Sequence, residues 1–238
     1  MKFLTKTLRY PSADLYMLLS CVIAFITLII SLNYLGEIWK YNDDKKDYEY
    51  KYAHNVEIRS ENTMADVLGV LDSAECNVIL RKELTISDGI KTINVNANII
   101  WAENEEAPLK ELNDFVSSKN GENICMVGKG ICEYLKKGKG DYLIIDGKSY
   151  RIANVLECSS DYYDGDVFLV RSNIDESLEE SIRQSNVVSL DFLSNKSDCT
   201  DEMSVIISDM KDVNSKLNIT VNKVEALSRR IVVTHLSN

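Results

Sequence analysis

Few side chains in this sequence are suited to catalysis. Its 238 residues include only two histidines, His54 and His235. A Ser/His/Asp relay needs a histidine between a nucleophile and a carboxylate, and histidine is also the commonest metal ligand in proteins. No pairing of a nucleophile with a base is visible along the chain. We therefore predict that the protein is not an enzyme and that it has no catalytic residue, no metal site and no cofactor.

Two glycine–lysine segments and one acidic segment share features with ligand-binding loops. Residues 128–130 and 138–140 both read Gly-Lys-Gly, but they lack the spacing and the Ser or Thr of a phosphate-binding P-loop. We interpret their glycines as turn residues. The segment DYYDGD could bind calcium through Asp161, Asp164 and Asp166, yet its spacing differs from that of an EF-hand loop. An acidic hairpin tip explains it better.

The six cysteines follow neither a zinc-binding nor a disulfide-framework pattern. Cys21 lies in an uncharged apolar run, and the other five are an odd number without a C-x-x-C pair. A zinc ribbon needs such pairs, and small disulfide-stabilised folds use denser and even sets. We therefore interpret most of the five as buried free thiols: Cys76, Cys125, Cys132, Cys158 and Cys199.

The charge balance restricts the possible partners. Lys and Arg number 27 against 37 Asp and Glu, which gives a formal charge of −10. Binding to a nucleic acid backbone needs clustered basic residues, so we predict no nucleic acid partner. Residues 1–14 carry +2, so the rest of the chain carries −12. Because complementary charge speeds encounter, we expect a cationic peptide or a basic protein as partner.

Residues 15–36 predict a transmembrane helix. These 22 residues carry no charge and would extend for about 33 Å as a helix, against a hydrocarbon core of roughly 30 Å. A signal peptide has a shorter apolar region and a small-residue cleavage site, which is missing here. We therefore predict a single-pass anchor in the bilayer of the cell membrane. Residues 1–14 form a cytoplasmic tail, and the large acidic part lies outside the cytoplasm.

The elements that follow predict an α+β fold made of two related halves. Residues 41–47 read as a polar stem, and apolar alternation over 48–59 predicts a strand. The pattern over 62–74 predicts an amphipathic helix with Asn62 as a possible cap. Two strands then follow over 78–86 and 93–101, with asparagines 94, 96 and 98 on a solvent face. Together these elements make up a first half at residues 41–102.

A β-rich segment and a second half complete the predicted architecture. Within residues 123–171 we expect a strand, a helical turn, a hairpin turning at Asp146-Gly147 and a strand over 167–170. A strand, a helix and a strand then repeat the pattern of the first half over residues 186–225. Residues 226–238 form a C-terminal tail. The pattern predicts a split βαβ sandwich with a separate β-rich inserted subdomain.

Residues 124–157 (ICMVGKGICEYLKKGKGDYLIIDGKSYRIANVLE) resemble part of the MacB/FtsX-type ABC transporter permeases. The matching pattern is a strand, a short helix, Gly140-Asp141, a strand, a hairpin turn and a second strand. The resemblance implies an N-terminal span and an extracytoplasmic periplasmic core domain. That domain has two halves of a porter-like α/β subdomain around a β-rich insert.

The resemblance also implies a function that needs other subunits. In such permeases a separate cytoplasmic ATPase drives the membrane spans, and the outer domain takes part in export or mechanotransmission. The family continues into three more spans, so these lie on another permease subunit, or the gene is truncated or a relict. The alternative is a stand-alone anchored module that binds an extracellular partner without transport.

Overall fold

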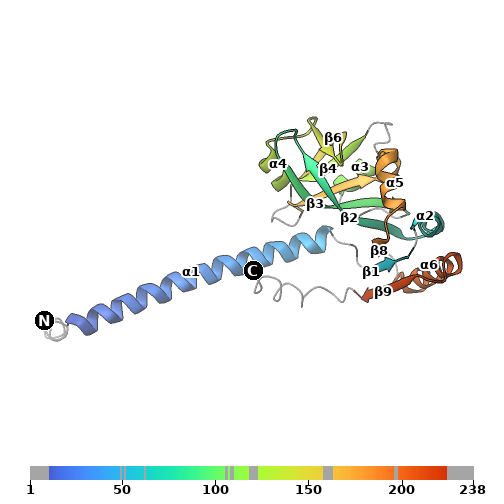
Figure 1. Cartoon of the computed structure of the whole chain (residues 1–238). Helices are drawn as coiled ribbons and strands as arrows, with labels where there is room; N and C mark the ends of the chain where they lie inside the picture. Colours follow the sequence, from blue (N-terminus) through green and yellow to red (C-terminus); the bar gives the residue numbers. More distant parts are fainter. Residues whose placement is uncertain are drawn as a thin grey trace.

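One long helix, α1 (Pro11–Tyr48), precedes a domain of strands and shorter helices and extends away from it (Figure 1). The computed structural model describes residues 11–48, 50, 52–61, 63–104, 107, 110–117, 123–157, 163–195 and 198–223. At 1.5 Å per residue, the 38 residues of α1 make a helix about 57 Å long. Residues 41–48, expected as a stem and the start of a strand, are helical instead. Neither Pro nor Gly interrupts them, so the helix continues through the polar residues.

The segment Leu15–Asn42 of α1 has the length and composition to cross a membrane. An 18-residue window within it has a mean hydropathy of 2.6 and contains no buried residue. Among the described residues it is the single helix with these properties. Ser20, Thr27 and Ser31 each donate a 2.8 Å hydrogen bond to the carbonyl four residues earlier. These hydroxyls are therefore satisfied without water, as a hydrocarbon environment requires.

The first part of the domain is a four-stranded antiparallel arrangement in the order β2-β8-β1-β9. On β1, alternate residues His54, Val56 and Ile58 are buried, which confirms the alternation from residue 52 onward. The strands are β1 (Tyr52–Arg59), β2 (Asn77–Ser87), β8 (Val187–Ser194) and β9 (Asn218–Lys223).

Short helices cover this sheet. Met64, Val67, Leu68 and Leu71 are fully or almost fully buried, as their spacing predicts. Asn62, the expected cap, lies outside the described residues.

The helix over residues 176–183 was not expected, because only Leu178 and Ile182 mark its buried face within a polar stretch. The helices are α2 (Ala65–Gly69), which continues as the 3-10 turn η2 (Val70–Ser73), α5 (Glu176–Arg183) and α6 (Thr200–Val213).

The remaining strands close a ring with β2. Along the ring, β2 pairs with β3, β3 with β7, β7 with β4, β4 with β6, β6 with β5, and β5 again with β2 at Ile86 and Ser87. The ring strands after β2 are β3 (Thr92–Ala102), β4 (Ile124–Gly128), β5 (Tyr142–Ile145), β6 (Lys148–Leu156) and β7 (Asp166–Val170). Two helices and a second 3-10 turn accompany it: α3 (Lys110–Ser117), α4 (Lys129–Leu135) and η3 (Arg171–Asn173).

The tight turns lie where the sequence places them. Asp146 and Gly147 link β5 to β6 with φ angles of 46° and 84°. Both angles are positive, as a two-residue type I′ hairpin turn requires. Gly89, between β2 and β3, has a φ of 94°.

The expected solvent face of β3 is only partly right: Asn94 and Asn96 are exposed, but Asn98 is buried, with 7% of its surface exposed. Ile100, two residues further on the same face, packs with Phe115 of α3.

The ring, which contains the strands of the expected insert, shares a large hydrophobic cluster with the four-stranded part, and a smaller second cluster also joins residues of both. Strand β2 belongs to both parts, and the phenolic oxygen of buried Tyr150 on β6 accepts a 2.9 Å hydrogen bond from the backbone of Asp175, the cap of α5. The α+β class is confirmed. The common cluster includes Val56, Leu190 and Phe192 from the four-stranded part, and Val127, Tyr150 and Val167 from the ring.

Because the core is shared, removing the insert should unfold the remainder. Replacing residues 103–186 by a short linker deletes β4 to β7 and α5, and it exposes the buried residues Leu84, Ile86, Ala97 and Ile99. We expect the shortened chain to aggregate or to melt without cooperativity, since burial of apolar surface supplies most of the folding free energy. Thermal melting followed by near-UV circular dichroism checks this against the full chain. A cooperative transition with a fixed tertiary signal would show that the halves fold without the insert.

Candidate functional site

His54 is buried beside two polar side chains, but their geometry is not that of a relay. Its Nε2 atom lies 2.8 Å from Asp198 Oδ1 and 3.2 Å from Thr200 Oγ1. A relay needs the carboxylate and the nucleophile on opposite ring nitrogens. Here both contact Nε2, and Nδ1 is buried without a hydrogen-bond partner in the described structure. Asp198 also accepts from the Thr200 backbone at 3.1 Å, so the group orders the start of α6.

Metal ligands do not gather within the described part of the chain, where no three His, Cys, Asp or Glu side chains could hold an ion together. Of the acidic segment, Asp161 lies outside the described residues. The Asp164 carbonyl accepts a 3.0 Å hydrogen bond from the amide of Ile131 on α4. Burial raises the pKa of Asp166 to about 6, a shift that Arg81 partly offsets.

The first Gly-Lys-Gly segment is a close contact between two chain segments, which corrects the expectation of turn glycines there. A Cβ atom on Gly128 would lie 1.8 Å from the carbonyl oxygen of Tyr163, and one on Gly130 would lie 3.0 Å from the Asp164 Cβ. Neither glycine has a positive φ angle. These residues are glycine because the backbone of the acidic segment passes directly over the start of α4.

The second Gly-Lys-Gly segment is a turn, as expected. Gly140 has a φ of 92°, and the amide of Gly138 donates a 2.9 Å hydrogen bond to Asp141 Oδ2. Lys136, which ends α4, adopts the left-handed conformation with a φ of 54°. The two segments therefore begin and follow the same short helix, but for different physical reasons.

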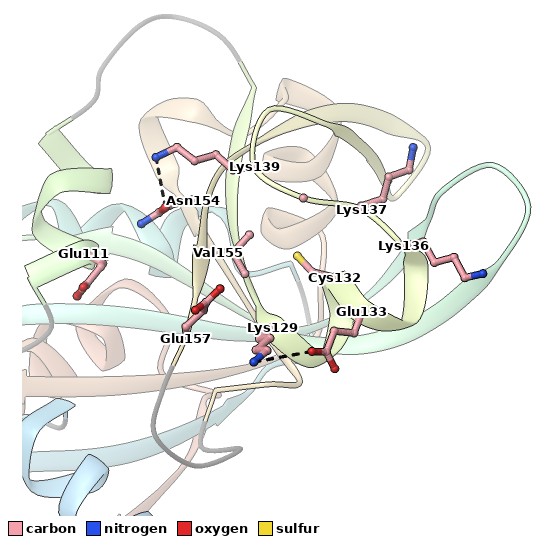
Figure 2. Close-up of a pocket in the computed structure, with 11 residues that line it drawn as sticks. Glu111, Lys129, Cys132, Glu133, Lys136, Lys137, Lys139, Asn154, Val155 and Glu157 are labelled. Atoms are coloured by element: carbon pink, nitrogen blue, oxygen red, sulfur yellow. Dashed lines mark hydrogen bonds and ion pairs between the residues drawn. The ribbon is translucent and has the colours of Figure 1, made fainter.

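Around α4 lies an open groove with a volume of about 790 Å³. Figure 2 shows that Lys129 points toward Glu133 and Lys139 toward Asn154, at 3.8 Å and 3.5 Å. Both signs of charge line the groove, so its charge alone does not select an anion or a cation. Its charged residues are Lys129, Lys136, Lys137, Lys139, Glu111, Glu133 and Glu157.

The described cysteines other than Cys21 are buried, as predicted, and none is in a disulfide. Burial raises the pKa of Cys125 to about 12 and that of Cys132 to about 11. Cys76 and Cys199 differ from these two because the largest influence on the pKa of each thiol is the other thiol, which raises the pKa of Cys76 and lowers that of Cys199. Cys21 lies exposed on α1, and Cys158 falls outside the described residues.

The helices that cover the four-stranded part form a mainly acidic surface, called the helical layer below. It consists of α2 with η2, α5 and α6, and α2 and η2 contact α6 while α2 contacts α5. Asp72 and Glu179 are paired with Arg171, but most of the other acidic side chains are exposed. The acidic residues are Asp66, Asp72, Glu176, Glu179, Glu180, Asp201, Glu202, Asp209 and Asp212, against the basic residues Arg183 and Lys211.

Sequence reasoning did not find the pairing of Arg171 with Trp101. The guanidinium carbon of Arg171 lies 4.5 Å from the ring centroid of Trp101, and that of Arg183 lies 5.9 Å from it. This cluster joins β3 to η3 and α5, which are far apart in the sequence. No local signal marks it, because these residues are far apart in the sequence and meet only in the folded domain.

The comparisons with known proteins concern the fold. No protein-family model and no curated protein matches the chain. The chain is similar to the periplasmic region of MacB from Actinobacillus actinomycetemcomitans, with 11% identity and a TM-score of 0.47 over 82% of this chain and 99% of that one. It is also similar to the extracellular domain of the ABC-type transporter YknZ from Gram-positive bacteria, with 15% identity and a TM-score of 0.43 over 70% and 99%.

A third solved structure is described in similar terms. It is a domain of a permease protein from Porphyromonas gingivalis, with 10% identity and a TM-score of 0.39 over 74% of this chain and 91% of that one.

Two glycine variants separate the close contact from the turn. Gly128→Ala puts a methyl group into the Tyr163 carbonyl, so we expect a loss of about 2–3 kcal/mol in the free energy of unfolding. The matched control is Gly138→Ala, because nothing lies within 4 Å of its Cβ position. Thermal or urea unfolding of both variants measures the difference. Equal stability of the two would show that the acidic segment does not pass over α4 as described.

Proposed function

We propose that this protein is the membrane-anchored extracytoplasmic part of an ABC-permease-like assembly. It takes part in export or mechanotransmission, driven by a separate cytoplasmic ATPase. The observation that supports this is the continuity of α1. The helix runs from the candidate span to Tyr48, and strand β1 begins only four residues later at Tyr52. The MacB-type resemblance of residues 124–157 supports the same assignment.

This continuity suits a domain that receives motion from the membrane. Helical residues 37–48 extend about 18 Å past the apolar run 15–36, and a helix transmits axial displacement with little bending. β1 lies between β8 and β9 and is hydrogen-bonded to both. A displacement of α1 would therefore act on an interior strand of the sheet, and would reach the ring through β8 and β2.

The proposed orientation places the N-terminus in the cytoplasm and the domain outside. The charge of +2 on residues 1–14 against −12 after the span supports this direction. Tyr16 at one end of the span, and Tyr34 and Trp39 at the other, are exposed side chains of the type that anchors helices at membrane interfaces.

Protease added to intact cells should remove the domain and leave a fragment that contains α1. The reason is that residues after the helix are accessible only from outside in this orientation. Immunoblotting against an N-terminal tag measures the fragment, with a cytoplasmic protein as the control that must stay intact. If the full-length band survives until the cells are lysed, the orientation is reversed.

The proposed partners are an ABC ATPase, a further membrane-spanning permease subunit and a basic protein or cationic peptide outside. The helical layer is the surface that suits the basic partner, because its acidic side chains are concentrated on neighbouring helices. We also propose that the chain has no ATPase or hydrolase activity of its own. This agrees with the geometry at His54, where Asp198 and Thr200 contact the same ring nitrogen, whereas a catalytic relay needs them on opposite nitrogens. The alternative remains an anchored module that binds its partner without an ATPase.

Purification of the full chain from its native membranes at low and high salt tests these partners. We expect an ATPase to stay bound at both salt concentrations and a basic partner to be lost at high salt, since exposed charges are screened. Asp209→Asn with Asp212→Asn should lower recovery of the basic partner at low salt by roughly twofold to thirtyfold, since each of two exposed ion pairs contributes about 0.2–1 kcal/mol.

The control pair for this experiment is Glu83→Gln with Asp114→Asn, which removes the same charge from exposed positions outside the helical layer. Recovery should then match the unmodified chain. Partners that are only neutral or acidic and indifferent to salt would contradict the electrostatic proposal. Absence of any ATPase would favour the anchored module, and nucleotide hydrolysis by the isolated chain would contradict the non-enzymatic role.

A further inference from the structure

Two buried thiols meet where strand β2 begins and helix α6 starts. Cys76 directly precedes β2 and is 2% exposed, and Cys199 caps α6 and is 3% exposed. The sulfur of Cys199 contacts the carbonyl oxygen of Phe192 at 3.6 Å, and Phe192 pairs with Val78, two residues after Cys76. Each thiol is also the largest influence on the pKa of the other, and both side chains belong to the same buried cluster.

The backbone on both sides of this contact is held in place. The amide of Cys76 donates a 2.7 Å hydrogen bond to Glu202 Oε1, which belongs to the first turn of α6. The carbonyl of Cys76 accepts from Asn104 Nδ2 at 3.1 Å. The carbonyl of Cys199 accepts the first helical hydrogen bond of α6 from Met203 at 2.9 Å. Both cysteines are therefore fixed by elements that already contact each other.

We propose that Cys76 and Cys199 form an intramolecular disulfide that links β2 to α6 when the domain folds outside the cytoplasm. This inference rests on the proposed extracytoplasmic location, because disulfides form and persist in oxidising compartments. It replaces the sequence-based interpretation of free thiols for this pair. The bond would close a loop that contains the whole ring, so it would fix α6 and the following edge strand β9 to the sheet.

The chemistry is thiol–disulfide exchange with an external disulfide, such as that of an oxidoreductase. Cys199 attacks as the thiolate and releases one thiol of the oxidant, which leaves a mixed disulfide. Cys76 then attacks the Cys199 sulfur and releases the second thiol. The two cysteines lose two electrons and two protons in total, and the oxidant becomes two thiols.

The electrostatic surroundings assign these two roles. The neighbouring Cys76 thiol lowers the pKa of Cys199, against an opposing effect of burial. The neighbouring Cys199 thiol raises the pKa of Cys76, and burial and the charge of Glu202 raise it further. Cys199 is thus the thiol that ionises first, and Cys76 is the one that resolves the mixed disulfide.

Oxidation of the full chain in detergent with oxidised glutathione tests the pair. After denaturation and alkylation, peptide mapping by mass spectrometry should find Cys76 joined to Cys199. The oxidised chain should unfold roughly 10 °C higher than the chain reduced with dithiothreitol. Cys76→Ser and Cys199→Ser should each abolish both effects, whereas Cys125→Ser should keep them. Free Cys76 and Cys199 after oxidation, or a bridge from either to Cys158, would overturn the proposal.

A second measurement separates this proposal from the proposed location. Cells are quenched with acid and alkylated at once, so that the thiol state in the cell is preserved. A Cys76–Cys199 bridge in these cells supports both the pair and the extracytoplasmic location. If the bridge forms with glutathione but both thiols are reduced in cells, the pair is capable of oxidation, and the location and the in-cell disulfide are both overturned.

Discussion

The domain depends on the pairing of strand β2 along both of its edges. One edge pairs with β3 for nearly the whole length of the strand. The other edge pairs with β8 from Asn77 to Arg81 and then with β5 at Ile86 and Ser87. Because one continuous strand belongs to both the four-stranded part and the ring, neither part has a core of its own. Apolar side chains from both meet in two clusters.

This arrangement explains why contacts that seem peripheral matter for the whole domain. Arg171 stacks over Trp101 and pairs with Asp72, so it ties the end of the ring to the helices that cover the sheet. Tyr150 joins β6 to the cap of α5 through its phenolic oxygen. Each contact crosses the boundary between the predicted halves and insert, and each adds to the cooperativity that β2 makes possible.

The same strand also connects, through its neighbours, the strand that follows α1 with the ring that carries α4. α1 leads to β1, β1 pairs with β8, and β8 pairs with β2, from which the ring is built. The proposed disulfide lies at the start of β2, where this route leaves the four-stranded part. The mainly acidic helical layer lies on the same part of the domain, so the strand that follows α1, the layer and the cysteine pair all belong to one part of the domain.

The sequence alone determined the features that depend on neighbouring residues. The uncharged run of α1, the alternation of β1, the spacing of Met64, Val67, Leu68 and Leu71, and the positive φ angles at Asp146 and Gly147 are local properties of the chain. Pattern and composition therefore predicted the α+β class and most strands. The helix over 41–48 and the helix α5 were missed, because polar stretches without a breaker carry little apolar periodicity.

The tertiary structure decided what depends on residues far apart in sequence. Periodicity gives the direction of a side chain relative to its own strand, but it does not give the neighbour of that strand. Only the fold could show that β2 is shared and that Gly128 faces the backbone of Tyr163. For the same reason the five cysteines outside the membrane read as an odd set without a pattern, although the fold places Cys76 against Cys199.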